Sequence, residues 1–121
     1  MNKACIFKSN VSAKREKETM QADGYHAFKA SGTNFEIESK YEMIRQVGTG
    51  AYGVVISADD KSTNTQVAIK KISRAFEDPV DAKRILREIK LMKMFAHENV
   101  IRVLDIVPPP PTCEEFEDIY I

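Results

Sequence analysis

The sequence predicts an α+β domain made of five short strands and one main helix. Short apolar segments bounded by turn residues indicate the strands, and one longer segment with apolar residues in a helical period indicates the helix. The 121 residues leave room for a single modest domain. The 18 Lys and Arg residues balance the 18 Asp and Glu residues, so the formal net charge is zero. We therefore expect neither a nucleic-acid nor a membrane partner.

Residues 1–34 are rich in Lys, Ser and Glu and show no lasting period of two or 3.6. We interpret them as a flexible leader to a folded domain at residues 35–121. The short apolar patch at residues 4–7 predicts neither a signal peptide nor a membrane span. Cys5 and Cys113 stand far apart, which fits a reducing compartment. We expect a soluble protein of the cytoplasm and nucleus.

Three strands are expected before the helix. Apolar residues alternate with polar ones from Phe35 to Val47, which predicts a first strand that ends at Gly48. The β-branched run at residues 54–56 predicts a second strand. Turn residues at 59–64 then lead to a third strand at residues 66–72. The order is strand, glycine turn, strand, turn, strand.

The helix is expected to begin at Asp78, because its side chain can accept from free backbone N–H groups and Pro79 needs no donor in the first turn. Apolar residues at positions 85, 89, 92 and 96 mark one face of a helix that reaches roughly Phe95. Residues 100–107 predict a fourth strand. Residues 108–111 are all proline and must leave any ladder, and residues 116–121 predict a last strand.

Gly48, Gly50 and Gly53 have the spacing GxGxxG, which lets the backbone approach a polyphosphate closely. A dinucleotide-binding turn has the same spacing but must open a helix, whereas the residues after Gly53 favour a strand. A P-loop is excluded, since no Gly-Lys-Ser/Thr follows. A hairpin lid over phosphates and an ordinary glycine-rich turn both stay open.

Lys70 ends an apolar strand and lies on the same strand face as Ala68. Its ammonium group could neutralise phosphates below the glycine turn, or it could simply be solvated. Glu88 lies beside the apolar face of the helix. It could pair with Lys70 or, equally well on spacing, with Arg84.

Arg84 and Arg87 give the helix a basic flank, which is either a solvated face or a receptor for a phosphorylated side chain. His97 follows the helix end, where a capping or packing role is favoured over metal binding. The other histidine, His26, lies far away in the sequence. We expect no metal site within the chain.

These segments together resemble the first three signature elements of protein kinases, in order. They are GTGAYGVV at residues 48–55, VAIK at residues 67–70, and Glu88 on the next helix. The segments AKRILREIKLM at 82–92 and HENVI at 97–101 are similar to those of mitogen-activated protein kinases, closest to the extracellular-signal-regulated type. The resemblance runs from about Phe35 to Ile121.

The resemblance implies the ATP-holding small lobe of a kinase, with a five-stranded antiparallel sheet. It implies that Ala68 helps line the adenine pocket, that Lys70 pairs with Glu88, and that Arg84 and Arg87 meet a phosphothreonine. The implied ATP-binding residues are Val47, Gly48, Thr49, Gly50, Ala51, Tyr52, Gly53, Val54, Val55, Ala68, Lys70 and Glu88.

The later signature elements of the family, His-Arg-Asp, Asp-Phe-Gly and Ala-Pro-Glu, do not occur in the chain. Phosphoryl transfer needs Mg²⁺ ligands and a base from those elements. We therefore expect no catalytic residue and no Mg²⁺ ligand here, and an inactive chain on its own. The whole kinase would use ATP and Mg²⁺ to phosphorylate Ser or Thr of protein substrates and would depend on an upstream activating kinase.

The alternative is a non-catalytic interaction module from a truncated kinase isoform. That module would expose Ile85, Met92 and the last strand as an adhesive surface.

Overall fold

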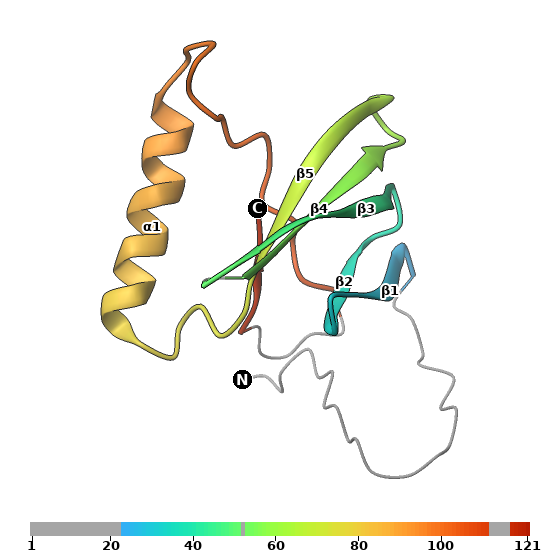
Figure 1. Cartoon of the computed structure of the whole chain (residues 1–121), viewed down its shortest axis with the longest axis horizontal. Helices are drawn as coiled ribbons and strands as arrows, with labels where there is room; N and C mark the ends of the chain where they lie inside the picture. The colour runs from blue at the N-terminus through green and yellow to red at the C-terminus, as the bar shows by residue number, and fades with distance from the viewer. Residues whose placement is uncertain (1–22, 52, 112–116) are drawn as a thin grey trace, which may run out of the picture.

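The structure, a computed structural model, describes residues 23–51, 53–111 and 117–121 (Figure 1). Within these residues it contains six strands and one α-helix. In chain order they are β1 (Tyr25–Ala30), β2 (Thr33–Glu38), β3 (Tyr41–Gly50), β4 (Gly53–Asp60), β5 (Thr65–Ile72), α1 (Pro79–Met94) and β6 (Ile119–Tyr120). The predicted α+β class with one main helix is confirmed.

The main sheet has four antiparallel strands in the order β3-β4-β5-β6, rather than the predicted five. Of the strand predicted at residues 116–121, only the two-residue β6 is formed, and residue 116 lies outside the described residues. Beyond β6, the backbone N–H and C=O of Lys70 each bond Ile121 at 2.9 Å. The last described residue therefore pairs with the edge of β5 at Lys70, the lysine that the sequence predicts to bind phosphate.

Residues 100–107, predicted as a strand, form no ladder. Only Val107 bridges Tyr120, with its N–H donating to the Tyr120 carbonyl at 2.9 Å. Because β6 is two residues long and a proline follows Val107, there is little backbone for a longer ladder. Val103 and Val107 are nevertheless buried, so this segment is anchored by its side chains.

Strands β1 and β2 form a separate antiparallel hairpin. The two turn residues, Ser31 and Gly32, have φ angles of 52° and 73°, as a type I′ turn requires. The predicted flexible leader at residues 1–34 is therefore wrong for β1 and the start of β2. Its first 22 residues lie outside the described residues. Strand β1 begins at Tyr25, ten residues before the predicted boundary at Phe35.

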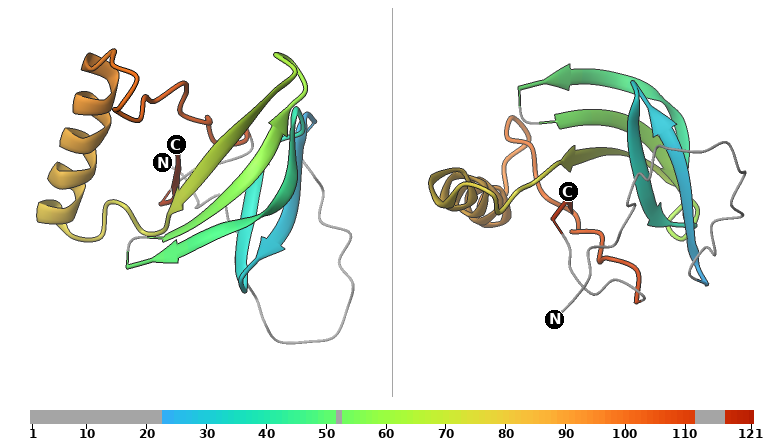
Figure 2. Two further views of the ribbon diagram at one scale, coloured as in Figure 1. Left: turned by 45° about the horizontal axis from the view of Figure 1, so that its top comes forward. Right: turned by 90° about the horizontal axis from the view of Figure 1, so that it is seen from below.

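Helix α1 begins where the sequence predicts. The Asp78 carboxylate accepts from the Val80 N–H at 2.8 Å, Pro79 follows, and Phe95 caps the other end. Ile85 and Ile89 are buried, and they form a cluster with Ile72 from the sheet. The helix thus packs beside the end of β5, away from the hairpin (Figure 2). It is neither long nor apolar enough to span a membrane, and it is the one helix among the described residues.

The two faces of the β3–β5 sheet differ. The hairpin covers one face, which we call the covered face, where Phe35, Ile37 and Ile56 are fully buried. The residues that alternate with the buried ones, such as Val55 in β4 and Ala68 in β5, point to the opposite side, which we call the open face. A predicted phosphate-binding side chain can act together with Lys70 only if it lies on the same face of the sheet.

Candidate functional site

Three of the predicted residues lie in one row across the sheet. Gly48 of β3 is the register partner of Val55 of β4, and Val55 is in turn the partner of Lys70 of β5. Partners in adjacent antiparallel strands point to the same side, so all three face the open side. At about 4.8 Å per strand, Lys70 stands about 10 Å from the glycine strand.

Lys70 is held by the helix. Its Nζ lies 3.1 Å from Glu88 Oε1, and the two side chains are 32% and 47% exposed. The intrahelical alternative is not formed, because Arg84 instead lies 3.7 Å from Asp81. The predicted pair between strand and helix is therefore present, and it aims the lysine toward α1 along the open face.

The three glycines have different structural reasons. A Cβ added to Gly48 or Gly50 would meet no atom within 4 Å, and neither glycine has a positive φ. A Cβ on Gly53 would lie 1.7 Å from the Lys71 carbonyl oxygen, and the φ of Gly53 is 150°. The fold itself therefore requires glycine only at Gly53, whereas Gly48 and Gly50 leave space that a ligand could fill.

The glycine strand is bent by irregular pairing. The register of β3 against β4 shifts between Met43 and Arg45 and again between Gln46 and Gly48. The second shift leaves Val47 unpaired and about half exposed. Across it, the Gln46 Nε2 donates to the Thr49 hydroxyl at 2.6 Å. Sequence analysis did not single out Gln46, since an isolated glutamine before a glycine run carries no recognisable signal.

The remaining predicted binding residues are divided between the faces. Ala68 and Ala51 are exposed. Val54 is buried in the core on the covered face, so its side chain is separated from those of Val55 and Lys70. Tyr52 lies outside the described residues. The side chains that share the open face are therefore fewer than the motif alone predicts.

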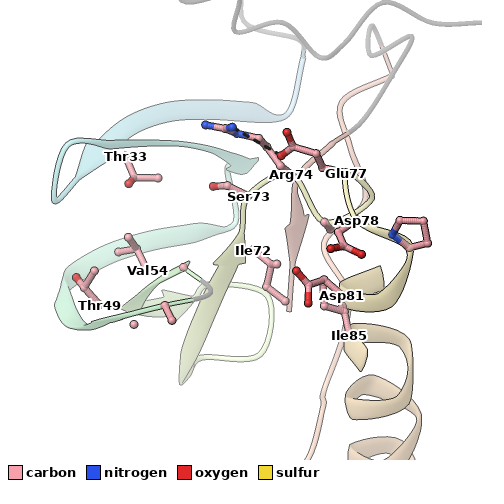
Figure 3. A pocket seen from close by; sticks show the side chains of 15 residues that line it. Thr33, Thr49, Val54, Ile72, Ser73, Arg74, Glu77, Asp78, Asp81 and Ile85 are labelled. Atoms are coloured by element: carbon pink, nitrogen blue, oxygen red, sulfur yellow. Dashed lines mark ion pairs between the residues drawn. The ribbon is translucent and has the colours of Figure 1, made fainter. Parts of the chain in front are cut away.

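Next to this row the surface is hollowed into an open cavity of about 960 Å³ (Figure 3). Thr49 and Val54 line it from the glycine turn, and Asp78, Asp81 and Ile85 line it from the start of α1. Neither Lys70 nor Glu88 lines the cavity. The cavity therefore adjoins the candidate site at the glycine turn. The candidate site itself is the row of Gly48, Val55 and Lys70 on the open face.

Lys71, the next residue, points to the covered face and is only 7% exposed. Its ammonium group lies 3.0 Å from Asp118, contacts the Asn34 carbonyl oxygen, and sits over the rings of Phe35 and Tyr120. Strand alternation predicts this orientation, because it puts Lys71 on the side opposite to Lys70, with Val67 and Ile69.

Burial governs the protonation of the groups near Lys71. Desolvation raises the pKa of the Glu36 carboxyl, although the positive charge of Lys71 opposes this effect. Burial also raises the pKa of the Tyr120 hydroxyl, which accepts a hydrogen bond from the Glu36 N–H at 3.2 Å. Both groups therefore favour their neutral forms more than they would in water.

The basic flank and the histidine occupy ordinary surface positions. Arg84 and Arg87 are exposed on α1. His97 accepts a hydrogen bond from the Asn99 N–H through Nδ1 at 3.0 Å, which is a local turn contact. Among the described residues, no group of three or more His, Cys, Asp or Glu side chains could hold a metal ion.

Comparison with known proteins agrees with this arrangement. The protein kinase domain model matches residues 41–114. Mitogen-activated protein kinase 4a of Physcomitrium patens is 48% identical over 98 residues, or 80% of this chain and 26% of that protein. Mitogen-activated protein kinase 4 of Arabidopsis thaliana is 43% identical over 119 residues, or 98% of this chain and 31% of that protein. The homolog NTF6 of Nicotiana tabacum is 52% identical over 98 residues, with 80% and 26% covered.

The chain spans about a quarter to a third of the length of these relatives. The strand that follows the glycine turn rules out a dinucleotide-binding turn, which would open a helix there. The glycine hairpin, the strand lysine and its helix carboxylate stand in the predicted order and geometry. The chain therefore belongs to the protein kinase family, and it corresponds to the small lobe of a kinase similar to the mitogen-activated protein kinases.

Proposed function

We propose that this chain binds ATP on the open face of its sheet, as the small lobe of a serine/threonine protein kinase. One observation carries the proposal. Gly48 and Gly50 have no steric reason of their own to be glycine, and Gly48 shares a row with a lysine that Glu88 holds in place. A close backbone approach next to a fixed positive charge suits a polyphosphate.

Each residue has a distinct task in this proposal. The Lys70 ammonium neutralises the α- and β-phosphates, and Glu88 fixes its position by their 3.1 Å ion pair. Backbone N–H groups of the glycine strand donate to phosphate oxygens. Val55 and Ala68, half-buried and exposed respectively on the open face, provide apolar contact for the base.

The described residues hold no side-chain cluster suited to Mg²⁺. We propose that the Mg²⁺ ligands and the catalytic base belong to a large lobe, so that the chain alone does not transfer phosphate. In the whole kinase, we propose that the γ-phosphate of ATP passes to Ser or Thr of protein substrates after activation by an upstream kinase. We propose action in the cytoplasm and nucleus, which imaging of a tagged chain tests.

Titration of the purified chain with ATP and Mg²⁺, followed by NMR shifts of Gly50, Gly53 and Lys70, tests the binding. Saturable binding that is lost in Lys70→Met supports the proposal. The matched control is Lys61→Met, because Lys61 is also an ion-paired lysine, 2.6 Å from Glu42, but lies in the far turn. Equal affinity of the wild type and Lys70→Met for ATP would overturn the proposed role of Lys70 in ATP binding.

A second candidate, the non-catalytic interaction module, is favoured by apolar side chains near the end of α1. Met94, Ile101 and Leu104 are each more than 70% exposed. The residues that the sequence predicts for that surface are less accessible, since Ile85 and Tyr120 are buried and Met92 is half-buried. A folded chain that shows no response to ATP, together with self-association that Ile101→Glu abolishes, would favour this candidate.

A further inference from the structure

We propose that Lys71 is a positioning residue, through which the β1–β2 hairpin sets the placement of the glycine turn and of Lys70. The inference rests on the proposed function of Lys70 in binding phosphate. Lys71 itself does not reach the open face, because its side chain points into the covered face.

The Lys71 side chain joins segments that are far apart in the sequence. Its ammonium group contacts the Asn34 carbonyl oxygen of β2 and lies 3.0 Å from Asp118, just before β6. It also lies 5.8 Å from the centre of the Phe35 ring and 5.5 Å from that of Tyr120. Hairpin, β5 and the end of the described chain therefore meet at one charged group that is almost fully buried.

The Lys71 backbone packs against the glycine turn. Val54 is the register partner of Lys71, and Gly53 packs so closely on the Lys71 carbonyl that no side chain fits there. A shift of Lys71 along or out of the sheet therefore moves the turn. It also moves the adjoining Lys70, whose backbone bonds Ile121 on the other edge of β5.

Two carboxyl groups lie near the Lys71 ammonium group. Asp118 pairs with Lys71, and the Glu36 carboxyl is near enough for the lysine to influence its titration. Asp118 also accepts from the Arg74 N–H at 3.0 Å, in the connection that leads to α1. The same carboxylate thus links the buried lysine to the segment that carries Glu88 toward Lys70.

The test compares ATP affinity in variants that remain folded by their amide NMR spectra. In Lys71→Met we expect about a tenfold weaker affinity for ATP with Mg²⁺, although the variant keeps Lys70. Lys71→Arg should restore most of the affinity, since it keeps the charge and the contact with Asp118. The matched control is Tyr25→Phe, which removes the hydrogen bonds from the hairpin to the carbonyls of Pro108 and Pro109 and should leave the affinity unchanged.

Amide hydrogen exchange at Gly48, Gly50, Gly53 and Lys70, measured without nucleotide, gives a second readout. Faster exchange there in Lys71→Met, but not in Tyr25→Phe, supports the coupling. If the wild type binds ATP and Lys71→Met binds equally well, the coupling is overturned and the proposed function stands. If the wild type does not bind ATP, the proposed function fails for this chain, and unchanged exchange in Lys71→Met would overturn the coupling as well.

Discussion

The two faces of the sheet give two neighbouring lysines opposite environments, one partly exposed to solvent and one buried. Lys70 lies on the open face with a third of its side chain in water, paired with a half-exposed carboxylate. Lys71 lies on the covered face, 7% exposed, between a carboxylate, a backbone carbonyl and two aromatic rings. Strand alternation alone produces this division, because consecutive side chains of a strand point to opposite sides.

Because the environments of the two lysines differ, we expect the covered face to contribute mainly to stability and the open face mainly to ligand binding. A half-exposed ion pair contributes little to folding, whereas a buried charge must be fully partnered or the fold is destabilised. We therefore expect changes on the covered face to alter unfolding strongly. Changes on the open face should alter nucleotide binding with little effect on unfolding. The glycines also differ, but through local packing rather than through the face they occupy: a Cβ on Gly53 would overlap the Lys71 carbonyl, whereas a Cβ on Gly48 or Gly50 would meet no atom within 4 Å.

The largest expected effect comes from Gly53→Ala. The new Cβ would overlap the Lys71 carbonyl, and a φ of 150° is strained for any residue with a side chain. We expect the free energy of unfolding to fall by at least about 3 kcal/mol. Urea unfolding followed by circular dichroism measures it, which suits a chain without tryptophan.

Gly50→Ala is the matched control for this change. It should alter the free energy of unfolding by less than about 1 kcal/mol while weakening ATP binding. Equal destabilisation by the two alanines would show that the close packing of Gly53 on the Lys71 carbonyl does not distinguish it from Gly50.

The lysines give the next largest contrast. Lys71→Met leaves the Asn34 carbonyl without its charged donor and should lower the free energy of unfolding by about 1–3 kcal/mol. Lys70→Met removes an exposed pair and should change it by no more than about 0.5 kcal/mol. The same urea experiment measures both variants. A larger loss in Lys70→Met than in Lys71→Met would contradict the division between the faces.

The helix and its pairing were predictable because their signals are local or specific. Asp78 and Pro79 indicate the start of α1, and the 3.6-residue period of its apolar residues predicts which side of the helix is buried. The pair of Lys70 with Glu88 needed more, since spacing alone left Arg84 as an equal partner for the glutamate. The ordered resemblance to the kinase family favoured Lys70.

The covered face was predicted poorly because it depends on contacts that are distant in the sequence. The hairpin alternates only weakly, and its turn, Ser31 and Gly32, was a readable signal that the surrounding polar residues obscured. The packing of the hairpin on the sheet has no local signature. The strand expected at residues 100–107 has the required composition, but β6, the described strand beside it, is only two residues long.

The smallest expected effect concerns Glu36, and it examines the electrostatic environment of Lys71 through pH. Burial raises the pKa of this carboxyl above its ordinary value of 4.5, while Lys71 lowers it. A group whose pKa is raised in the folded state loses its stabilising contribution as the pH rises through that pKa. Glu36→Gln should therefore be more stable than the wild type at pH 7, by less than about 0.5 kcal/mol, and equal to it near pH 4.

The same substitution made together with Lys71→Met sharpens the test. Lys71 lowers the pKa of Glu36 against the effect of burial, so this pKa should rise further without the lysine. Glu36→Gln should then stabilise the protein more at pH 7 than it does when Lys71 is present. Urea unfolding of the four proteins at both pH values measures this coupling. Strictly additive effects would mean that Lys71 and Glu36 do not share one electrostatic environment.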